Sequence, residues 1–262
     1  MSHHVKTVDT HAHICDEAFD ADRGGVLKRA EESGVAAVIA VGEDLSDARR
    51  NLELALEHPI LRPAAGLYPT HLDPGQAEAM AAFIRRERNR LYAIGEVGLD
   101  YRAIKEEAER EIQRVIFADF ITLARELDLP LNVHSRSAGH YTLDLLLSEG
   151  AQRVQLHAYD GRLGPALEGA RAGYFFSIPP SVLRSRQKQK LVKGLPLSCL
   201  LAETDSPVLG PQPAQRNEPA NVLLVVDAIA EIKGKARQEV LEALLENTLH
   251  LYGDLQLPLS MR

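Results

Sequence analysis

The sequence predicts an α/β protein, a single eight-stranded (β/α)₈ barrel domain that covers residues 1–262. Short apolar runs alternate with amphipathic helical segments through most of the chain, which is typical of parallel strands joined by crossover helices. There are eight such runs, the number of strands that closes a barrel of this kind. The length is also usual for one barrel, and no linker or low-complexity segment divides the chain.

The eight predicted strands are the apolar runs at 5–8, 36–41, 61–67, 91–99, 131–134, 154–157, 174–178 and 199–202. Predicted helices lie at 23–33, 45–57, 75–88, 104–128, 140–149, 184–193, 219–232 and 236–250. The clearest is 104–128, because Ile112, Ile116 and Phe120 recur at helical spacing with charged residues between them. The segment 207–219, rich in Pro and Gln, is expected to be a long loop after the last strand, and such loops are often functional.

Composition and charge narrow the class of protein. The formal net charge of −7 argues against a protein that coats nucleic acid through a large basic surface. It does not exclude an enzyme that acts on phosphate esters, because bound divalent metals bring their own positive charge. No apolar run approaches the roughly 18 residues of a membrane helix, and no signal peptide is visible. We therefore expect a cytoplasmic protein without a membrane segment, and the sequence indicates no obligate protein partner.

Two cysteines, Cys15 and Cys199, are too few for a disulfide framework. Each lies in or beside an apolar run, so a buried free thiol is expected at both positions.

Histidines and carboxylates lie at or near the ends of the predicted strands. His11 and His13 form an HxH pair near the end of the first strand, and alternate residues of a strand point to the same side. The later strands contribute four more candidates, Glu96, His134, His157 and Asp205. Because the carboxyl ends of barrel strands meet at one rim, we expect all six side chains to converge there. Such ligands suit Zn²⁺, and sites richer in carboxylate and water suit Mg²⁺ or Mn²⁺.

Each candidate also has an ordinary structural explanation. A strand histidine is often a hydrogen-bonded core residue, and an Asp or Glu at a strand end often caps the next helix. Those explanations would have to hold at every position of the same rim, so a shared metal site is favoured. His71, which follows the third strand, stays open as an outer ligand, whereas His58, His140 and His250 lie in or at the end of predicted helices.

Five ordered motifs around these residues closely resemble the TatD family of metal-dependent deoxyribonucleases: DTHAH, AIGEVGLDY, NVHSRSAG, LHAYDG and ETDSP followed by RNEP. The resemblance runs from Val8 to ENTLHLYG near the C-terminus, and GYFFSIPPS and QKQKLVKGLP are similar to the TatD-domain-containing protein 3 subfamily. It implies a barrel of the amidohydrolase superfamily that binds two, sometimes three, divalent metal ions. It also implies hydrolysis of DNA phosphodiester bonds, from 3′ ends or at abasic sites.

The resemblance divides the ligands between two metals, one held by His11, His13, Glu96 and Asp205 and the other by Glu96, His134 and His157. Glu96 then bridges the two ions, and Asp205 is the best candidate for the general base that takes a proton from the attacking water. Arg136 and Arg216 are candidate phosphate contacts, with a plain surface ion pair as the alternative for each. The basic stretch 184–190 could steer a DNA backbone or form a solvated helix face.

One motif departs from the family. A histidine usually stands in a G-x-H-P motif after strand three, where this chain has Tyr68. Tyrosine is a poor metal ligand at neutral pH, because its pKa is near 10. A third metal or a phosphate contact from this position is therefore in doubt.

Two other kinds of protein compete with a nuclease. The main alternative is a small-molecule amidohydrolase or phosphodiesterase on the same barrel, and a second is a metal-binding scaffold without activity. Amidohydrolases often bridge their metals with a carbamylated lysine on strand four. The predicted fourth strand contains Glu96 and no lysine, which favours the nuclease.

Overall fold

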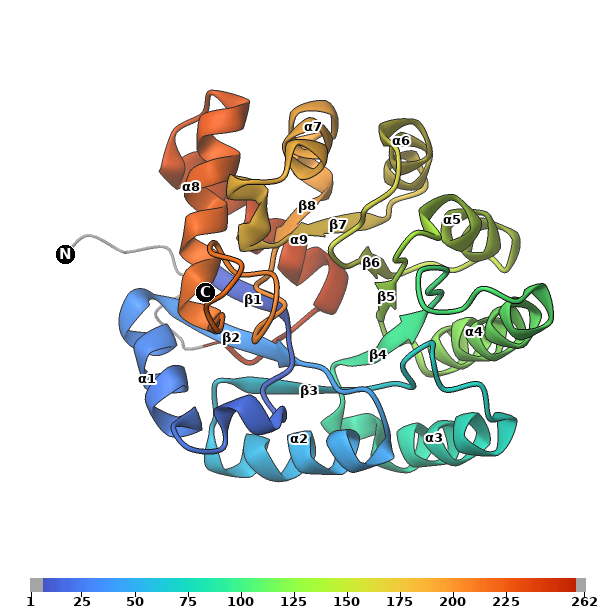
Figure 1. Cartoon of the computed structure of the whole chain (residues 1–262). Helices are drawn as coiled ribbons and strands as arrows, with labels where there is room; N and C mark the ends of the chain where they lie inside the picture. The colour runs from blue at the N-terminus through green and yellow to red at the C-terminus, as the bar shows by residue number, and fades with distance from the viewer. Residues whose placement is uncertain (1–6, 258–262) are drawn as a thin grey trace.

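The computed structural model describes residues 7–257 and contains a parallel sheet of eight strands in the order of the chain, from β1 to β8 (Figure 1). The strands are β1 (Thr7–Ala12), β2 (Val35–Ala40), β3 (Leu61–Ala65), β4 (Ala93–Gly98), β5 (Leu131–His134), β6 (Val154–Leu156), β7 (Phe175–Ile178) and β8 (Leu200–Ala202). The first and last strands meet, since the Asp205 N–H donates to the His11 carbonyl oxygen at 2.8 Å. The predicted (β/α)₈ barrel is therefore confirmed.

Helices surround the strands in Figure 1. They are α1 (Arg23–Ser33), α2 (Leu45–Glu57), α3 (Pro74–Glu87), α4 (Glu107–Leu127), α5 (Gly139–Ser148), α6 (Leu163–Arg171), α7 (Arg186–Gly194), α8 (Val222–Lys233) and α9 (Arg237–Tyr252). Short 3₁₀ turns lie between them, η1 (Glu17–Phe19), η2 (Arg88–Arg90), η3 (Pro180–Leu183), η4 (Leu197–Cys199) and η5 (Pro219–Asn221). Within residues 7–257, no helix is both long and apolar enough to cross a membrane.

Local sequence explains where several helices begin. The Asp44 carboxylate accepts hydrogen bonds from two backbone N–H groups at the start of α2, and Asp73 caps α3 in the same way. Pro74 stands in the first turn of α3, where a missing N–H costs nothing. The stripe predicted for 104–128 is found on α4, where Ile116 and Phe120 are buried.

Helix α6 is the element that the sequence pattern failed to predict. Its sequence contains Gly164, Pro165 and Gly169, and glycine and proline are poor helix formers, so the segment lacks a clear helical pattern. Pro165 lies in the first turn, where proline is tolerated. At Gly169 a Cβ atom would lie 2.7 Å from the Leu143 side chain, so the close packing of α5 on α6 requires glycine there.

Strand β1 is also longer than the predicted run at 5–8, because it continues to Ala12. His11 therefore lies within the strand and His13 just beyond its end. Val5 lies outside the described residues. The predicted helix at 184–193 begins later, since the chain first makes the turn η3 and α7 starts at Arg186. Both cysteines are buried and free, as expected.

The barrel interior is apolar at one end and polar toward the rim at which the carboxyl ends of the strands meet. Val8, Ile39 and Leu201 form a buried cluster with Leu251 and Leu255, which follow from α9 and the segment after it. Nearer the rim the interior is filled by buried polar side chains, among them Thr10, Asn132, Gln155, Ser177 and Glu203. Hydrogen bonds of these side chains hold residues nearer the rim in place, as Asn132 does for His11 and Glu203 does for Ala158.

Candidate metal centre

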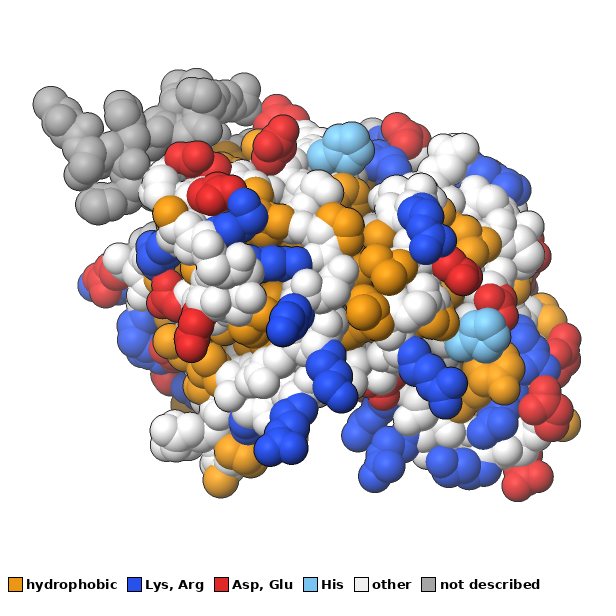
Figure 2. All heavy atoms as spheres, turned by 90° about the horizontal axis from the view of Figure 1, so that it is seen from above, with side chains coloured by type: hydrophobic (Ala, Val, Ile, Leu, Met, Phe, Trp, Pro, Cys, Tyr) orange, Lys and Arg blue, Asp and Glu red, His pale blue; other side chains and the backbone are white. Residues whose placement is uncertain are grey.

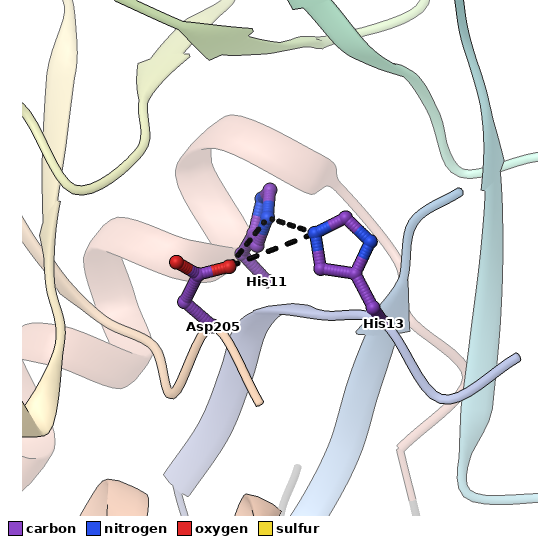
Figure 3. Close-up of side chains that lie close together, drawn as sticks. All are labelled: His11, His13 and Asp205. Carbon is purple, nitrogen blue, oxygen red and sulfur yellow. Dashed lines mark hydrogen bonds and ion pairs between the residues drawn. The ribbon is translucent and has the colours of Figure 1, made fainter. Parts of the chain in front are cut away.

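His11, His13 and Asp205 point toward one another at the rim (Figure 3). The two histidines come from β1 and the residue beyond its end, and Asp205 follows β8. The His11 Nε2 atom lies 3.3 Å from His13 Nε2 and 3.4 Å from Asp205 Oδ1. His13 Nε2 lies 3.6 Å from the same carboxylate oxygen. Three potential ligand atoms thus form a nearly equilateral triangle.

Glu96 of β4 supplies a fourth atom. Its Oε2 lies 3.2 Å from His13 Nε2 and 3.7 Å from His11 Nε2. Ligands at about 2.1 Å around a tetrahedral ion stand about 3.4 Å apart, which matches the separations between these four side chains. The same separations are at or beyond the long end of the range for hydrogen bonds. The arrangement therefore fits a shared cation better than a network of direct contacts.

The other oxygen of Glu96 faces a second group. Its Oε1 lies 2.6 Å from His134 Nδ1 and 2.8 Å from His157 Nε2, and these two nitrogens are 3.1 Å apart. The His157 ring stacks on that of His11, with the ring centroids 3.9 Å apart, so the two groups are adjacent. The structure brings all six predicted residues together, and Glu96 lies between the two groups of histidines. The atoms of the second group lie at hydrogen-bond separations, so a cation bound among them would have to move them apart.

A buried, unpartnered atom supports the same interpretation. Glu96 Oε2 is buried and accepts no hydrogen bond within residues 7–257. A carboxylate oxygen without a partner in the interior costs free energy, and a metal ion would satisfy it. Burial opposes ionisation of Glu96, but His157 and His134 outweigh it and hold the pKa of the carboxyl well below its usual range. Glu96 is thus an anion ready to bind cations.

The pKa values of the histidines differ according to the charges of their neighbours. Burial disfavours the charged form of His11, yet Asp205 and Glu96 outweigh it and raise its pKa to about 10. His134 follows the same pattern, with Glu96 and Asp100 raising its pKa to about 9. Burial and the charge of His11 lower the pKa of His157 to about 4. A histidine binds a metal in its neutral form, so cation binding at His11 and His134 would compete with their protonation.

Second groups hold the histidine rings in place. His11 Nδ1 lies 2.8 Å from Asn132 Oδ1, and the Asn132 amide donates to the Thr10 carbonyl, so the ring keeps Nε2 free for the site. His134 Nε2 lies 3.1 Å from the buried Asp100 carboxylate, which leaves Nδ1 facing Glu96. Contacts of this kind fix the tautomer and orientation of ligand histidines.

Two buried side chains, Glu203 and Lys188, form a clamp that fixes the backbone after His157. Ala158 adopts a positive φ of 39°, which is unusual for a residue other than glycine. The Ala158 N–H donates to Glu203 Oε1 at 2.8 Å, and its carbonyl accepts from Lys188 Nζ at 2.9 Å. The Ser177 hydroxyl donates to the other Glu203 oxygen at 2.5 Å. Glu203 and Lys188 therefore hold the loop that positions His157.

The clamp leads to a stability prediction. Glu203→Ala should lower the free energy of unfolding by about 2–4 kcal/mol, because two buried donors lose their acceptor. Glu203→Gln keeps a carbonyl oxygen for Ala158 and serves as the matched control, with a smaller loss. Urea denaturation of the metal-free proteins measures both. Equal stability of the alanine variant and the parent would contradict the clamp.

The two predicted phosphate contacts occupy different surroundings. Arg136 is exposed, and its charge acts on the Tyr68 phenol at the mouth of the site. Arg216 forms ion pairs with Asp22, the shorter at 2.7 Å, and donates to the Ala18 carbonyl at 2.6 Å. The structure thus shows at Arg216 the ion pair that was the alternative for it, while its contact with phosphate stays a prediction.

Tyr68 and His71 lie beside the centre rather than in its two ligand groups. The Tyr68 hydroxyl is 3.4 Å from Asp100 Oδ2, and its ring packs edge-on against His134 with centroids 4.9 Å apart. Burial and the nearby Glu96 raise the pKa of Tyr68 far above its ordinary value. His71 Nδ1 lies 3.2 Å from Gln76 Oε1.

Asn132, Asp100, Glu203 and Lys188 were not predicted to serve the site. Two of them gave a usable signal, because Asp100 lies within the motif AIGEVGLDY and Glu203 opens ETDSP. Asn132 and Lys188 show nothing in the sequence beyond their residue types. Their contacts with the site appear only once distant segments are folded together.

A barrel with histidines and carboxylates gathered at one rim is the arrangement expected of a metal-dependent hydrolase. The chain belongs to the TatD family, since the family model described as TatD related DNase matches residues 8–253. It is 42% identical over 264 residues to human deoxyribonuclease TATDN3, with 96% of each chain covered. An uncharacterized metal-dependent hydrolase of Methanocaldococcus jannaschii is 35% identical over 250 residues, covering 95% of this chain and 97% of its own.

A solved structure agrees with the fold. The TatD homologue YjjV from Escherichia coli superposes with a TM-score of 0.88 at 28% identity, covering 95% of this chain and 99% of its own. The family and the fold expected from the sequence motifs are both confirmed.

Proposed function

We propose that this chain is a deoxyribonuclease that hydrolyses DNA phosphodiester bonds with two divalent cations, one in each ligand group described above. The observation that carries the proposal is Glu96, whose two oxygens face two separate groups of histidines. Divalent cations bound there would activate a water for attack and neutralise charge on the phosphoryl oxygens. Mg²⁺, Mn²⁺ and Zn²⁺ are the candidates.

Asp205 is proposed as the proton acceptor. Its Oδ1 faces His11 and His13, while its second oxygen accepts no side-chain hydrogen bond from the rest of 7–257. Burial opposes its ionisation, but the nearby His11 outweighs burial and lowers the pKa of Asp205. An ionised carboxylate with one oxygen uncommitted can take the proton of an attacking water.

Arg136 is proposed as a phosphate contact. Its exposed side chain follows His134 by two residues, and its charge is felt at Tyr68 beside the ligand groups. A guanidinium can donate two parallel hydrogen bonds to a phosphate group. Arg216 would first have to leave Asp22, so it is the weaker candidate of the two.

A small-molecule amidohydrolase or phosphodiesterase is the second candidate. The fold alone permits it, but β4 reads AIGEVG and offers a carboxylate where those enzymes often carry a modified lysine. The experiment that separates the two uses labelled single-stranded, duplex and abasic DNA beside a panel of amides and small phosphodiesters. Cleavage of DNA supports the proposal, and its fragments distinguish digestion from 3′ ends from cleavage at abasic sites. Turnover of an amide alone would contradict it.

Metal removal gives the first activity prediction. Chelation followed by desalting should abolish DNA cleavage, and adding Mg²⁺, Mn²⁺ or Zn²⁺ should restore it, because the residues alone hold no group that could replace the cations. The measurement is initial rate against metal content determined by atomic spectroscopy. Full activity in a sample verified as metal-free would rule out the mechanism.

A further inference from the structure

The arginines around the rim differ in whether an acidic side chain neutralises them. On the side formed by the segments after β8, β1 and β2, four arginines are paired: Arg216 with Asp22 at 2.7 Å, Arg29 with Glu218 at 2.6 Å, Arg23 with Asp20 at 2.5 Å and Arg50 also with Asp20. The exposed Arg49 is the exception, since it forms no ion pair within 7–257. The segment after β2 adds the exposed Glu43 and the capping carboxylate of Asp44. This side of the rim therefore presents little uncompensated positive charge.

The opposite side of the rim, formed by the segments after β5, β6 and β7, is different. Its arginines are exposed and form no ion pair within 7–257: Arg136, Arg162, Arg184 and Arg186. The only side-chain hydrogen bond among them runs from Arg184 to the Gly210 carbonyl oxygen at 3.4 Å. The acidic residue of these segments, Asp160, accepts from the Ser137 N–H at 3.0 Å and makes no ion pair with them.

The sequence around β7 reinforces this asymmetry. Residues 179–190, which follow β7, contain Arg184, Arg186, Lys188 and Lys190 and no Asp or Glu, in a chain whose formal net charge is −7. Figure 2 looks down on the helices at the top of Figure 1, α6 to α8 among them. Its lower edge is the side that faces the viewer in Figure 1, and blue Lys and Arg side chains lie there on both sides of a hollow.

An anionic partner gains free energy when it lies beside exposed arginines that no acidic side chain neutralises. Arg136 links this surface to the ligand groups, because its charge acts on Tyr68, which packs against His134. A partner that reaches the centre along this side therefore meets positive charge up to the ligand groups. From the other side it meets carboxylates and arginines that are already paired.

We propose that DNA beside the bond to be cleaved lies across the β5–β7 side of the rim, where Arg136, Arg162, Arg184 and Arg186 contact its phosphates, and not across the β8–β1–β2 side. This assignment rests on the proposed function, since it takes DNA as the substrate. The spacing of the arginines over three successive segments suits a chain of phosphates rather than one isolated phosphate group.

The experiment compares two double variants that each remove two positive charges. R162Q/R186Q removes unpaired arginines, and neither guanidinium forms an ion pair or a hydrogen bond within 7–257. R29Q/R50Q is the matched control, and it removes arginines that are already paired. Binding of a labelled single-stranded DNA oligonucleotide is measured by fluorescence anisotropy over a range of salt concentrations, with chelator present so that no strand is cut.

The expected result is binding by R162Q/R186Q that is about 5- to 25-fold weaker at low salt, from two exposed charge contacts. The slope of log affinity against log salt should fall by about 1.4, because each lost contact to a single strand removes about 0.7. R29Q/R50Q should bind as the parent does. Equal losses in both variants, or a larger loss in R29Q/R50Q, would overturn the assignment.

Two further measurements keep this result separate from the proposed function. Cleavage of the same oligonucleotide by the metal-loaded parent protein tests that function directly, whatever the two variants do. A parent that cuts DNA together with variants that bind alike would refute only the path across the rim. An RNA strand of the same sequence is the other probe, and tighter binding of RNA than of DNA would contradict the choice of DNA.

Discussion

Replacing Asp205 by Asn is expected to lower turnover on DNA by roughly 10²–10⁴-fold, the usual contribution of a positioned proton acceptor. The amide keeps the shape of the carboxylate and still offers an oxygen to the first ligand group, but it cannot take a proton at neutral pH. DNA affinity should change little, and the cation held by Glu96, His134 and His157 should be retained. The measurements are single-turnover rate, metal content and DNA affinity.

His134→Ala is the comparison that separates loss of a base from loss of a ligand. Removing this imidazole takes one of the three close-set atoms from the second ligand group. Metal occupancy should fall, and excess metal should partly restore the rate. Asp205→Asn should not respond to excess metal in this way. Near-normal turnover of Asp205→Asn would show that another group takes the proton, and the role assigned to Asp205 would be wrong.

The meeting of these six side chains could be predicted from sequence because the geometry of the barrel places them at one rim. Residues that end different strands, such as His134 and Asp205, need no local signal to be neighbours, since all strands deliver their carboxyl ends to one rim. His11 and His13 are brought to the same side by the alternation of a strand. Once eight strands are recognised, their ends identify the site.

The supporting residues could not be predicted in the same way. Asn132 orients His11 from 121 positions away, and Glu203 reaches Ala158 across 45 positions. Neither contact produces a periodic pattern in the sequence. Each depends on which side chains from different strands meet inside the barrel. Helix α6 was not predicted for a local reason. Gly169 packs closely against Leu143, and a glycine lowers the helix propensity of the segment.

The pairing of surface charges was even harder to predict from the sequence. Arg216 and Arg162 have the same residue type and both follow a strand, yet only Arg216 meets a carboxylate. Its partner Asp22 is 194 positions away, and nothing near Arg216 in sequence indicates the pair. The net charge does not show where positive charge lies on the surface. A chain with a net charge of −7 can still carry exposed arginines without ion pairs on one side of the rim.

Replacing Glu96 by Gln is expected to weaken both cation sites at once. Glu96 Oε2 approaches His11 and His13, whereas Oε1 approaches His134 and His157. Glutamine keeps one oxygen but turns an NH₂ group, which cannot bind a cation, toward one of the two groups. It also removes the negative charge from a fully buried position among the histidines. Affinity for both cations should fall by more than about 100-fold, beyond the 10–100-fold usual for a supporting residue.

Isothermal titration with Mn²⁺ or Zn²⁺, together with metal analysis of the purified variant, measures the two sites separately. Glu203→Gln is the matched control, because it makes the same change of carboxylate to amide at a fully buried residue that faces Ala158 and Ser177 instead of the ligand groups. It should retain both cations within about 10- to 100-fold of the parent affinity. Loss of a single cation in Glu96→Gln, with the other bound as in the parent, would show that Glu96 serves one site only and does not bridge.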